Sequence, residues 1–164
     1  MKNKLQTIVS EICDTEILGL GNKNFFDDTL ENIHFQCGLV ADVHFENVVF
    51  KNVDFSATAF FETSFKNCIL EDSRFAKSEF LKCIFDNCRI KNGNFIRAEF
   101  NDTSFKNCDF LNGIIHAALF TNCEIIETNF TDTELAQIMG ESIKFRKLKE
   151  CIDIKKSWKL EKIL

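Results

Sequence analysis

The 164-residue sequence predicts an all-β solenoid, and three regularities of the chain predict it. A bulky apolar residue falls on every fifth position from Leu20 to Leu135, and 16 of the 19 Phe lie on this grid. The residue two places before each of these centres is nearly always small. Segments twenty residues apart are variants of one another, as in FENVVF (45–50), FKNCIL (65–70), FDNCRI (85–90) and FKNCDF (105–110). A period of five fits neither a helix nor a strand alone, so the chain is predicted to be a stack of repeated coils.

One large and one small inward residue in every five would fill a narrow interior completely. The predicted core contains both kinds of residue, namely Phe45, Phe65, Phe85 and Phe105 with Cys68, Cys88 and Cys108. A free Cys behaves as a small buried hydrophobe, and no CxxC pair accompanies these residues. We therefore expect structural, reduced thiols rather than a disulfide framework or a metal site.

Polar residues repeat with the same twenty-residue period. Glu46, Lys66, Asp86 and Lys106 alternate in sign down one column. If successive coils pair like strands about 4.8 Å apart, the column is a ladder of opposite charges. Asn or Asp recurs two places after most centres, and these residues tolerate the left-handed backbone that a type II turn needs. A turn is predicted at each corner.

The tandem pattern small–x–Phe/Leu–x–Asn/Gly resembles the pentapeptide-repeat proteins, and the match covers about residues 25–135. The resemblance implies a right-handed, quadrilateral (four-sided) β-helix with four repeats per coil and the centre residues inward. Residues 20–135 then make about six coils.

The two ends depart from the grid. Residues 1–19 are predicted to form an N-terminal cap, with either a helix or a strand over Lys4–Ile12, because an open solenoid end exposes apolar rungs. Residues 136–164 hold eight Lys or Arg against four acids. Phe145, Leu148 and Ile152 have helical spacing, and Ile154 and Trp158 are four apart. This predicts a basic, helical C-terminal cap, whose charged face is either solvated or in contact with nucleic acid or lipid.

Catalytic motifs are absent from the sequence. There is no Gly-rich phosphate loop, no HExxH and no Ser–His–acid set with suitable geometry. His34, His44 and His116 sit beside centre residues, on the predicted outer surface, and the first two fall on opposite sides of a four-sided coil. We expect no enzyme, no cofactor and no metal ion. Without a signal-peptide pattern or an apolar span, the expected location is cytoplasmic and the chain is not expected to contact a membrane.

Two surface features are candidate sites. Phe61 and Leu81 stack in one column, and Ile84 lies on the same side, so these three residues form a candidate partner surface. The repeat region is acidic, with 18 Asp or Glu against 10 Lys or Arg over residues 20–135. The candidate acidic stripe comprises Asp42, Glu62, Glu79, Glu99 and Asp102. Lys77, Lys82 and Arg97 interrupt it, which dilutes the field of a single sign.

The sequence thus predicts a protein-interaction module. Among pentapeptide-repeat proteins, the chain also resembles, more weakly, the quinolone-resistance type, which implies an acidic rod that imitates DNA and binds DNA gyrase. The alternative is a structural scaffold or dimerisation module with an unidentified protein partner. We expect a monomer or a homodimer, and the negative balance disfavours direct binding to nucleic acid.

Overall fold

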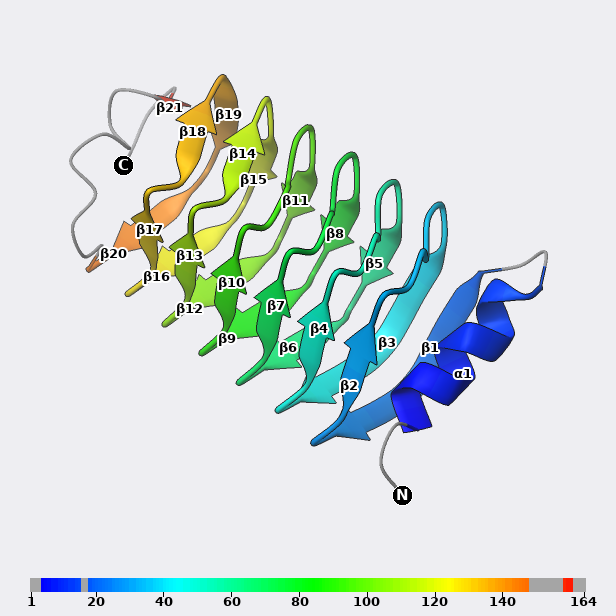
Figure 1. Cartoon of the computed structure of the whole chain (residues 1–164). Coiled ribbons are helices and arrows are strands. Elements are labelled where there is room, and N and C mark those ends of the chain that lie inside the picture. Colours follow the sequence, from blue (N-terminus) through cyan, green and yellow to red (C-terminus); the bar gives the residue numbers. More distant parts are fainter. Residues whose placement is uncertain (1–3, 16–17, 148–157, 161–164) are drawn as a thin grey trace.

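The computed structural model describes residues 4–15, 18–147 and 158–160, and it is a parallel β-solenoid of about six turns with a helix at the N-terminal end. Figure 1 shows the turns stacked along one axis, from β1 at one end to β19 and β20 at the other. The all-β solenoid fold is confirmed. The right-handed, four-sided cross-section stays an implication of the resemblance.

The helix α1 spans Lys4–Cys13, and the strands form three sheets. The largest comprises β1 (Gly19–Phe26), β3 (Leu39–Glu46), β5 (Ala59–Phe61), β6 (Ser64–Lys66), β8 (Glu79–Leu81), β9 (Ile84–Asp86), β11 (Glu99–Asn101), β12 (Ser104–Lys106), β15 (Leu119–Thr121), β16 (Glu124–Ile126), β19 (Ile138–Glu141), β20 (Lys144–Arg146) and β21 (Trp158–Leu160). The second comprises β2 (Thr29–Glu31), β4 (Val49–Lys51), β7 (Ile69–Glu71), β10 (Arg89–Lys91), β13 (Asp109–Leu111) and β17 (Asn129–Thr131). The third pairs β14 (Ile114–His116) with β18 (Glu134–Ala136).

Every paired strand is parallel to its neighbour, with each residue opposite the one twenty places later. Phe45 lies opposite Phe65, and Phe65 lies opposite Phe85. Each turn therefore contains four segments, which we number from the centres Leu20, Phe25, Leu30 and Phe35 and their equivalents in later turns. The twenty-residue period is thus the length of one turn.

The centre residues point inward and stack along the axis. The ring of Phe85 lies 4.7 Å from that of Phe65 and 4.9 Å from that of Phe105, and both pairs are nearly parallel. All seven predicted core residues are buried, with at most 2% of each exposed. The thiols fill the small positions: Cys88 Sγ donates to the Phe65 carbonyl at 3.2 Å. The adjacent Cys88 thiol and burial raise the pKa of Cys68, so this thiol stays protonated.

A left-handed residue lies two places after each centre, where φ ranges from 47° to 60°. After the third segment this residue is always Asn or Asp, which adopt the conformation most easily among non-Gly residues. After the fourth segment none of the described positions carries Asn, Asp or Gly. These positions are Cys37, Ala57, Lys77, Arg97, Ala117 and Gln137. Backbone strain therefore recurs at this corner in every described turn, whereas the other corners carry such residues in some turns at most.

We expect Ala57→Gly to raise the free energy of unfolding by about 1 kcal/mol, because glycine has no Cβ penalty at a φ of 56°. The turn itself would be kept, since its hydrogen bond runs from the Thr58 amide to the Phe55 carbonyl. Urea titration measures the change. Ala59→Gly in β5 is the matched control and should lose roughly 0.5–1 kcal/mol. Equal effects of the two substitutions would contradict the strain at residue 57.

A helix or a strand was predicted for the N-terminal cap, and the structure has the helix. Leu5 and Val9 are buried against the first turn, and the Leu5 amide donates to Asp28 Oδ2 at 2.8 Å. The Gln6 side chain accepts from the Glu31 amide and donates to its carbonyl. It thus takes the place of a neighbouring strand at the edge of β2, which an open solenoid end would leave unpaired. No helix in the described part of the chain is long and apolar enough to cross a membrane.

The predicted C-terminal helix is wrong for residues 138–146, which form β19 and β20 and continue the solenoid beyond Leu135. The grid persists there: Phe145 is a centre residue opposite Ile125, and Gln137, Ser142 and Lys147 are left-handed. The interruption is Gly140 at a centre position, where the Ile143 side chain occupies the space that a Cβ would need. Leu148, Ile152 and Ile154 lie outside the described residues, and Trp158 lies in β21 beside Ile138.

Candidate interaction surface

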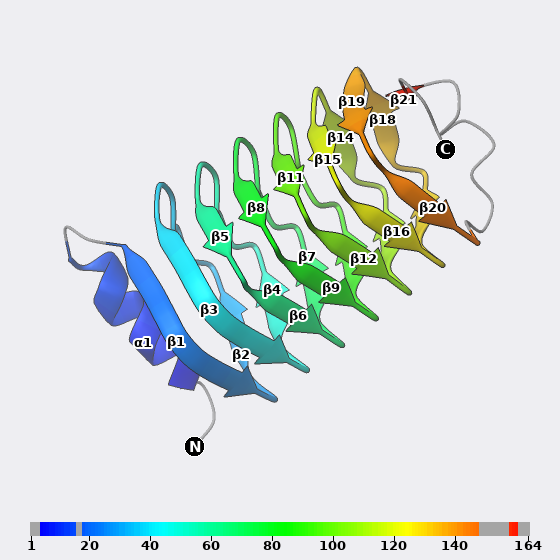
Figure 2. The same ribbon diagram turned by 180° about the vertical axis from the view of Figure 1, so that it is seen from behind.

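The apolar cluster, defined as Phe61, Leu81 and Ile84, lies on the outside of the largest sheet. Phe61 ends β5, Leu81 ends β8 directly opposite it, and Ile84 begins β9. Figure 2 shows β5 and β8 side by side, with β9 continuing from β8 on the same face of the rod. Side chains that flank an inward centre must point outward, so the three side chains are 37%, 38% and 47% exposed. The structure therefore brings the predicted partner surface together and leaves it accessible.

Lys82 joins the apolar cluster to the acidic stripe. Its Nζ lies 5.7 Å from the centre of the Phe61 ring and 3.1 Å from Glu62 Oε1. The ammonium group is thus attracted by the ring and by the carboxylate of the preceding turn. The charge of Glu62 is balanced locally, which weakens the acidic field at this place.

The other acidic residues lie in two columns. Glu79 and Glu99 are opposite each other in β8 and β11, so their carboxylates are neighbours. Asp42, Glu62 and Asp102 share the corner column that follows the first segment, but Lys82 lies between the last two. The structure therefore brings Glu79 and Glu99 together and places Asp102 two turns from Glu62, with Lys82 in the turn between them.

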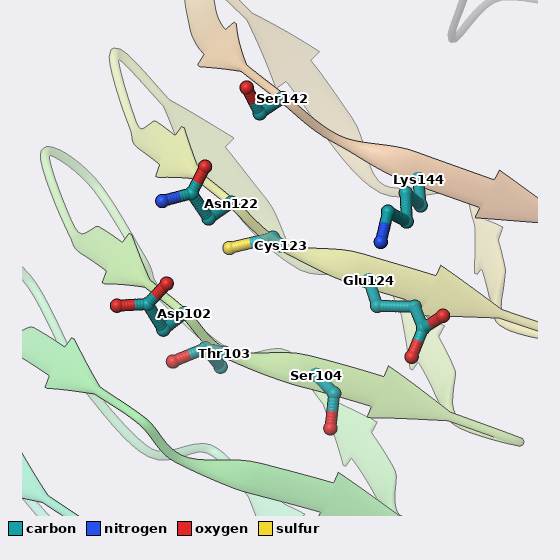
Figure 3. A pocket seen from close by; sticks show the side chains of 8 residues that line it. All are labelled: Asp102, Thr103, Ser104, Asn122, Cys123, Glu124, Ser142 and Lys144. Carbon is teal, nitrogen blue, oxygen red and sulfur yellow. The ribbon is translucent and has the colours of Figure 1, made fainter. Parts of the chain in front are cut away.

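A polar groove continues this surface toward the C-terminal end (Figure 3). One rim consists of Asp102, Asn122 and Ser142, the opposite rim consists of Ser104, Glu124 and Lys144, and Thr103 and Cys123 lie between the rims. The volume of the groove is about 460 Å³. Burial raises the pKa of Cys123 to about 11, so its thiol is neutral at physiological pH. Sequence reasoning found only Asp102 of this groove.

Asp54 is a buried carboxylate that the sequence analysis missed. It is 9% exposed and accepts hydrogen bonds from the Ser56 amide and hydroxyl at 2.9 and 2.6 Å and from Gln36 Nε2 at 2.6 Å. Arg74 Nε lies 4.0 Å away. Burial opposes ionisation, but these hydrogen bonds and the Arg74 charge outweigh it and lower the pKa of Asp54. The spacing Asp54–x–Ser56, with Gln36 in the preceding turn, is the sequence feature that could have indicated this hydrogen-bonded carboxylate.

Asp54→Asn should lower the free energy of unfolding at neutral pH by roughly 1–3 kcal/mol, because an amide cannot accept all three bonds. The pKa of Asp54 is lowered on folding, so its contribution is present above about pH 4 and is lost as the pH falls through the folded-state value. Denaturant titrations of both proteins between pH 7 and pH 2 measure this. A difference that stays constant over the range would contradict an ionised Asp54.

Metal-binding and nucleophilic groups do not gather on this surface. The structure places no three His, Cys, Asp or Glu side chains of the described residues close enough to hold a metal ion. His44 Nδ1 lies 2.7 Å from Ser64 Oγ, beside the apolar cluster. Burial raises the pKa of the Cys83 thiol to about 12, so a reactive thiolate is not formed there at neutral pH. The geometry fits binding by surface contact.

Comparison with solved structures supports the fold. QnrB1, a plasmid-mediated fluoroquinolone resistance protein, superposes with a TM-score of 0.66 and 16% identity, over 82% of this chain and 86% of that one. HetL, a pentapeptide-repeat protein involved in heterocyst differentiation regulation from the cyanobacterium Nostoc sp., has a TM-score of 0.58 and 9% identity, over 87% and 70%. No family model and no curated protein sequence matches the chain. The chain has the fold of the pentapeptide-repeat proteins, as the sequence resemblance implied.

Proposed function

We propose that this protein is a non-enzymatic protein-interaction module that binds a partner through the apolar cluster. The observation that carries the proposal is the exposure of three large apolar side chains in adjacent strands. Burial of such a patch against a partner is favourable, at roughly 25 cal/mol per Å² of apolar surface removed from water. Lys82 and Glu62 would supply a polar rim to the contact.

The test replaces Ile84 with the photo-reactive benzoylphenylalanine in the full chain, expressed in cells of the native host. Ile69 is the matched control, because it is the same residue type, is 41% exposed, and belongs to the third segment instead. Crosslinking to a discrete protein from position 84 but not from position 69 supports the module. A crosslink between two copies of the chain supports the dimerisation alternative. Identical products from both positions would refute an interface at the apolar cluster.

A specific candidate partner is DNA gyrase, in the manner of a DNA mimic that protects against fluoroquinolones. The resemblance to the quinolone-resistance type and the likeness to the fold of QnrB1 favour this candidate. The paired carboxylates of Glu79 and Glu99, with Asp102, would supply the negative charge. The expected location, where the enzyme and its DNA are found, is cytoplasmic.

The gyrase candidate is tested by a supercoiling assay with purified protein, with and without a fluoroquinolone. Inhibition of supercoiling, or rescue of it from the drug, is expected, and Glu79→Lys with Glu99→Lys should abolish the effect. Glu79→Lys alone and Glu134→Lys, which lies on the exposed fourth segment, form a matched pair of single charge reversals, and only the first should weaken the effect. No effect at tens of micromolar protein would reject gyrase as the partner and leave the apolar cluster as the site for another one.

A further inference from the structure

We propose that the polar groove and the apolar cluster together bind an extended segment of the partner protein with the sequence apolar–x–x–Lys/Arg. This inference rests on the proposed function and names the chemistry of the partner. It is carried by the order of side chains along the rod, by two carboxylates on opposite rims of the groove, and by the spacing of the turns.

The apolar cluster and the groove share one rim. Ser64, Ile84, Ser104, Glu124 and Lys144 are successive neighbours in β6, β9, β12, β16 and β20. Figure 2 shows these strands in one row along the rod. From Ile84 onward, a chain that lies along this row therefore meets an apolar residue, then a small polar residue, and then two charged residues of opposite sign.

The groove holds two carboxylates, those of Asp102 and Glu124, against one ammonium group, that of Lys144. Asp102 and Glu124 lie on opposite rims (Figure 3), and neither has a Lys or Arg nitrogen of the described residues within 4.0 Å. The surface residues Glu46, Glu62, Glu71 and Glu127 differ, because each is paired with a Lys one turn later. Glu124 has Lys144 one turn later but forms no such ion pair with it. A Lys or Arg of the partner would supply the missing positive charge.

The spacing of the turns gives the spacing of the motif. Successive turns lie about 4.8 Å apart, so Ile84 and Glu124, two turns apart, are separated by roughly 10 Å along the axis. A peptide in the extended polyproline II conformation rises about 3.1 Å per residue and has three residues per turn, so side chains three positions apart lie on the same side and roughly 9 Å apart. The apolar side chain that contacts Leu81 and Ile84 is therefore followed, three positions later, by the basic residue. Asp102 and Glu124 would repel a phosphate backbone, which favours a peptide over a nucleic acid.

The experiment screens an array of random twelve-residue peptides with the purified full chain. The wild-type protein should enrich peptides with the apolar–x–x–Lys/Arg motif. Glu124→Lys should weaken binding of the enriched peptides tenfold or more and shift the preference at the fourth motif position to Asp or Glu. Ile84→Ser should remove the preference at the first position. Glu134→Lys, an identical change of charge in β18, should leave the motif unchanged.

An enriched motif without a basic residue, or equal effects of Glu124→Lys and Glu134→Lys, would overturn the inference. The same holds if no peptide is enriched. Crosslinking from position 84 remains a separate readout of the proposed function. A discrete crosslinked partner together with a negative array would mean that the module binds a folded surface, whereas failure of both measurements would refute the module itself.

Discussion

Replacing Phe85 with Ala is expected to lower the free energy of unfolding by about 3–5 kcal/mol. Phe85 lies in the middle of the rod and stacks on Phe65 in one turn and Phe105 in the next, while Phe80 contacts it edge-on at 5.6 Å. Truncation would remove ring contacts in three directions and leave a cavity between rigid turns. Guanidinium titration followed by far-ultraviolet circular dichroism measures the change.

Two further variants test whether the loss of stability depends on the volume of the Phe85 side chain and on its position along the rod. Phe85→Leu keeps most of the volume and should cost less than about 1.5 kcal/mol. Phe130→Ala removes the same ring near the C-terminal end, where Phe130 stacks on Phe110 and is 8% exposed. It should cost clearly less than Phe85→Ala. A loss below about 1 kcal/mol for Phe85→Ala would mean that the centre residues are not tightly packed.

Leu5→Ala is expected to detach the N-terminal cap, with a local loss of about 2–5 kcal/mol. Leu5 is fully buried, and the hydrogen bond from its amide to Asp28 Oδ2 helps to hold α1 against the first turn. In a solenoid each turn contacts only its neighbours, so the damage should stay near the end of the rod. Hydrogen exchange should become faster at the amides of β1 and β2 and remain unchanged in β9–β12.

Glu11→Ala is the control for the cap, because Glu11 lies on the exposed face of α1. It should leave the exchange rates of β1 and β2 unchanged. Faster exchange along the entire rod in Leu5→Ala would show that the solenoid unfolds as one cooperative unit. Unchanged exchange in β1 would show that the helix does not stabilise the first turn.

Much of the fold could be predicted because one pattern determines it. The same five-residue grid defines the inward residues, the turn positions and, through its twenty-residue variants, the length of a turn. The prediction of the C-terminal segment failed because the grid was identified by its large apolar centres, and the centre position 140 carries Gly. The side chain that fills the space there belongs to Ile143, three places later. The helical spacing of Phe145, Leu148 and Ile152 then suggested a helix, although Phe145 itself falls on the grid.

The candidate site was predictable only in part. The twenty-residue period of the sequence placed Phe61, Leu81 and Ile84 on one side of the rod, and the structure has them there. The period could not show how far Lys82 reaches toward both the Phe61 ring and Glu62, because that depends on side-chain conformation. The groove was missed for a similar reason. Its rims come from a corner column and a strand column, and only the path of the backbone shows that a hollow lies between them.

Four exposed ion pairs of the described residues help to prevent the turns from winding out of register while the chain folds. They are Lys66–Glu46, Lys82–Glu62, Lys91–Glu71 and Lys147–Glu127. A turn closed five residues too early or too late would still place one centre residue over another. It would also place Lys66 over Lys51 in the first case and Lys91 over Lys66 in the second. Each pair contributes only about 0.2–1 kcal/mol to the correct structure, yet a misregistered turn exchanges attraction for repulsion. Surface charge thus makes winding errors unfavourable that the repetitive core alone would tolerate.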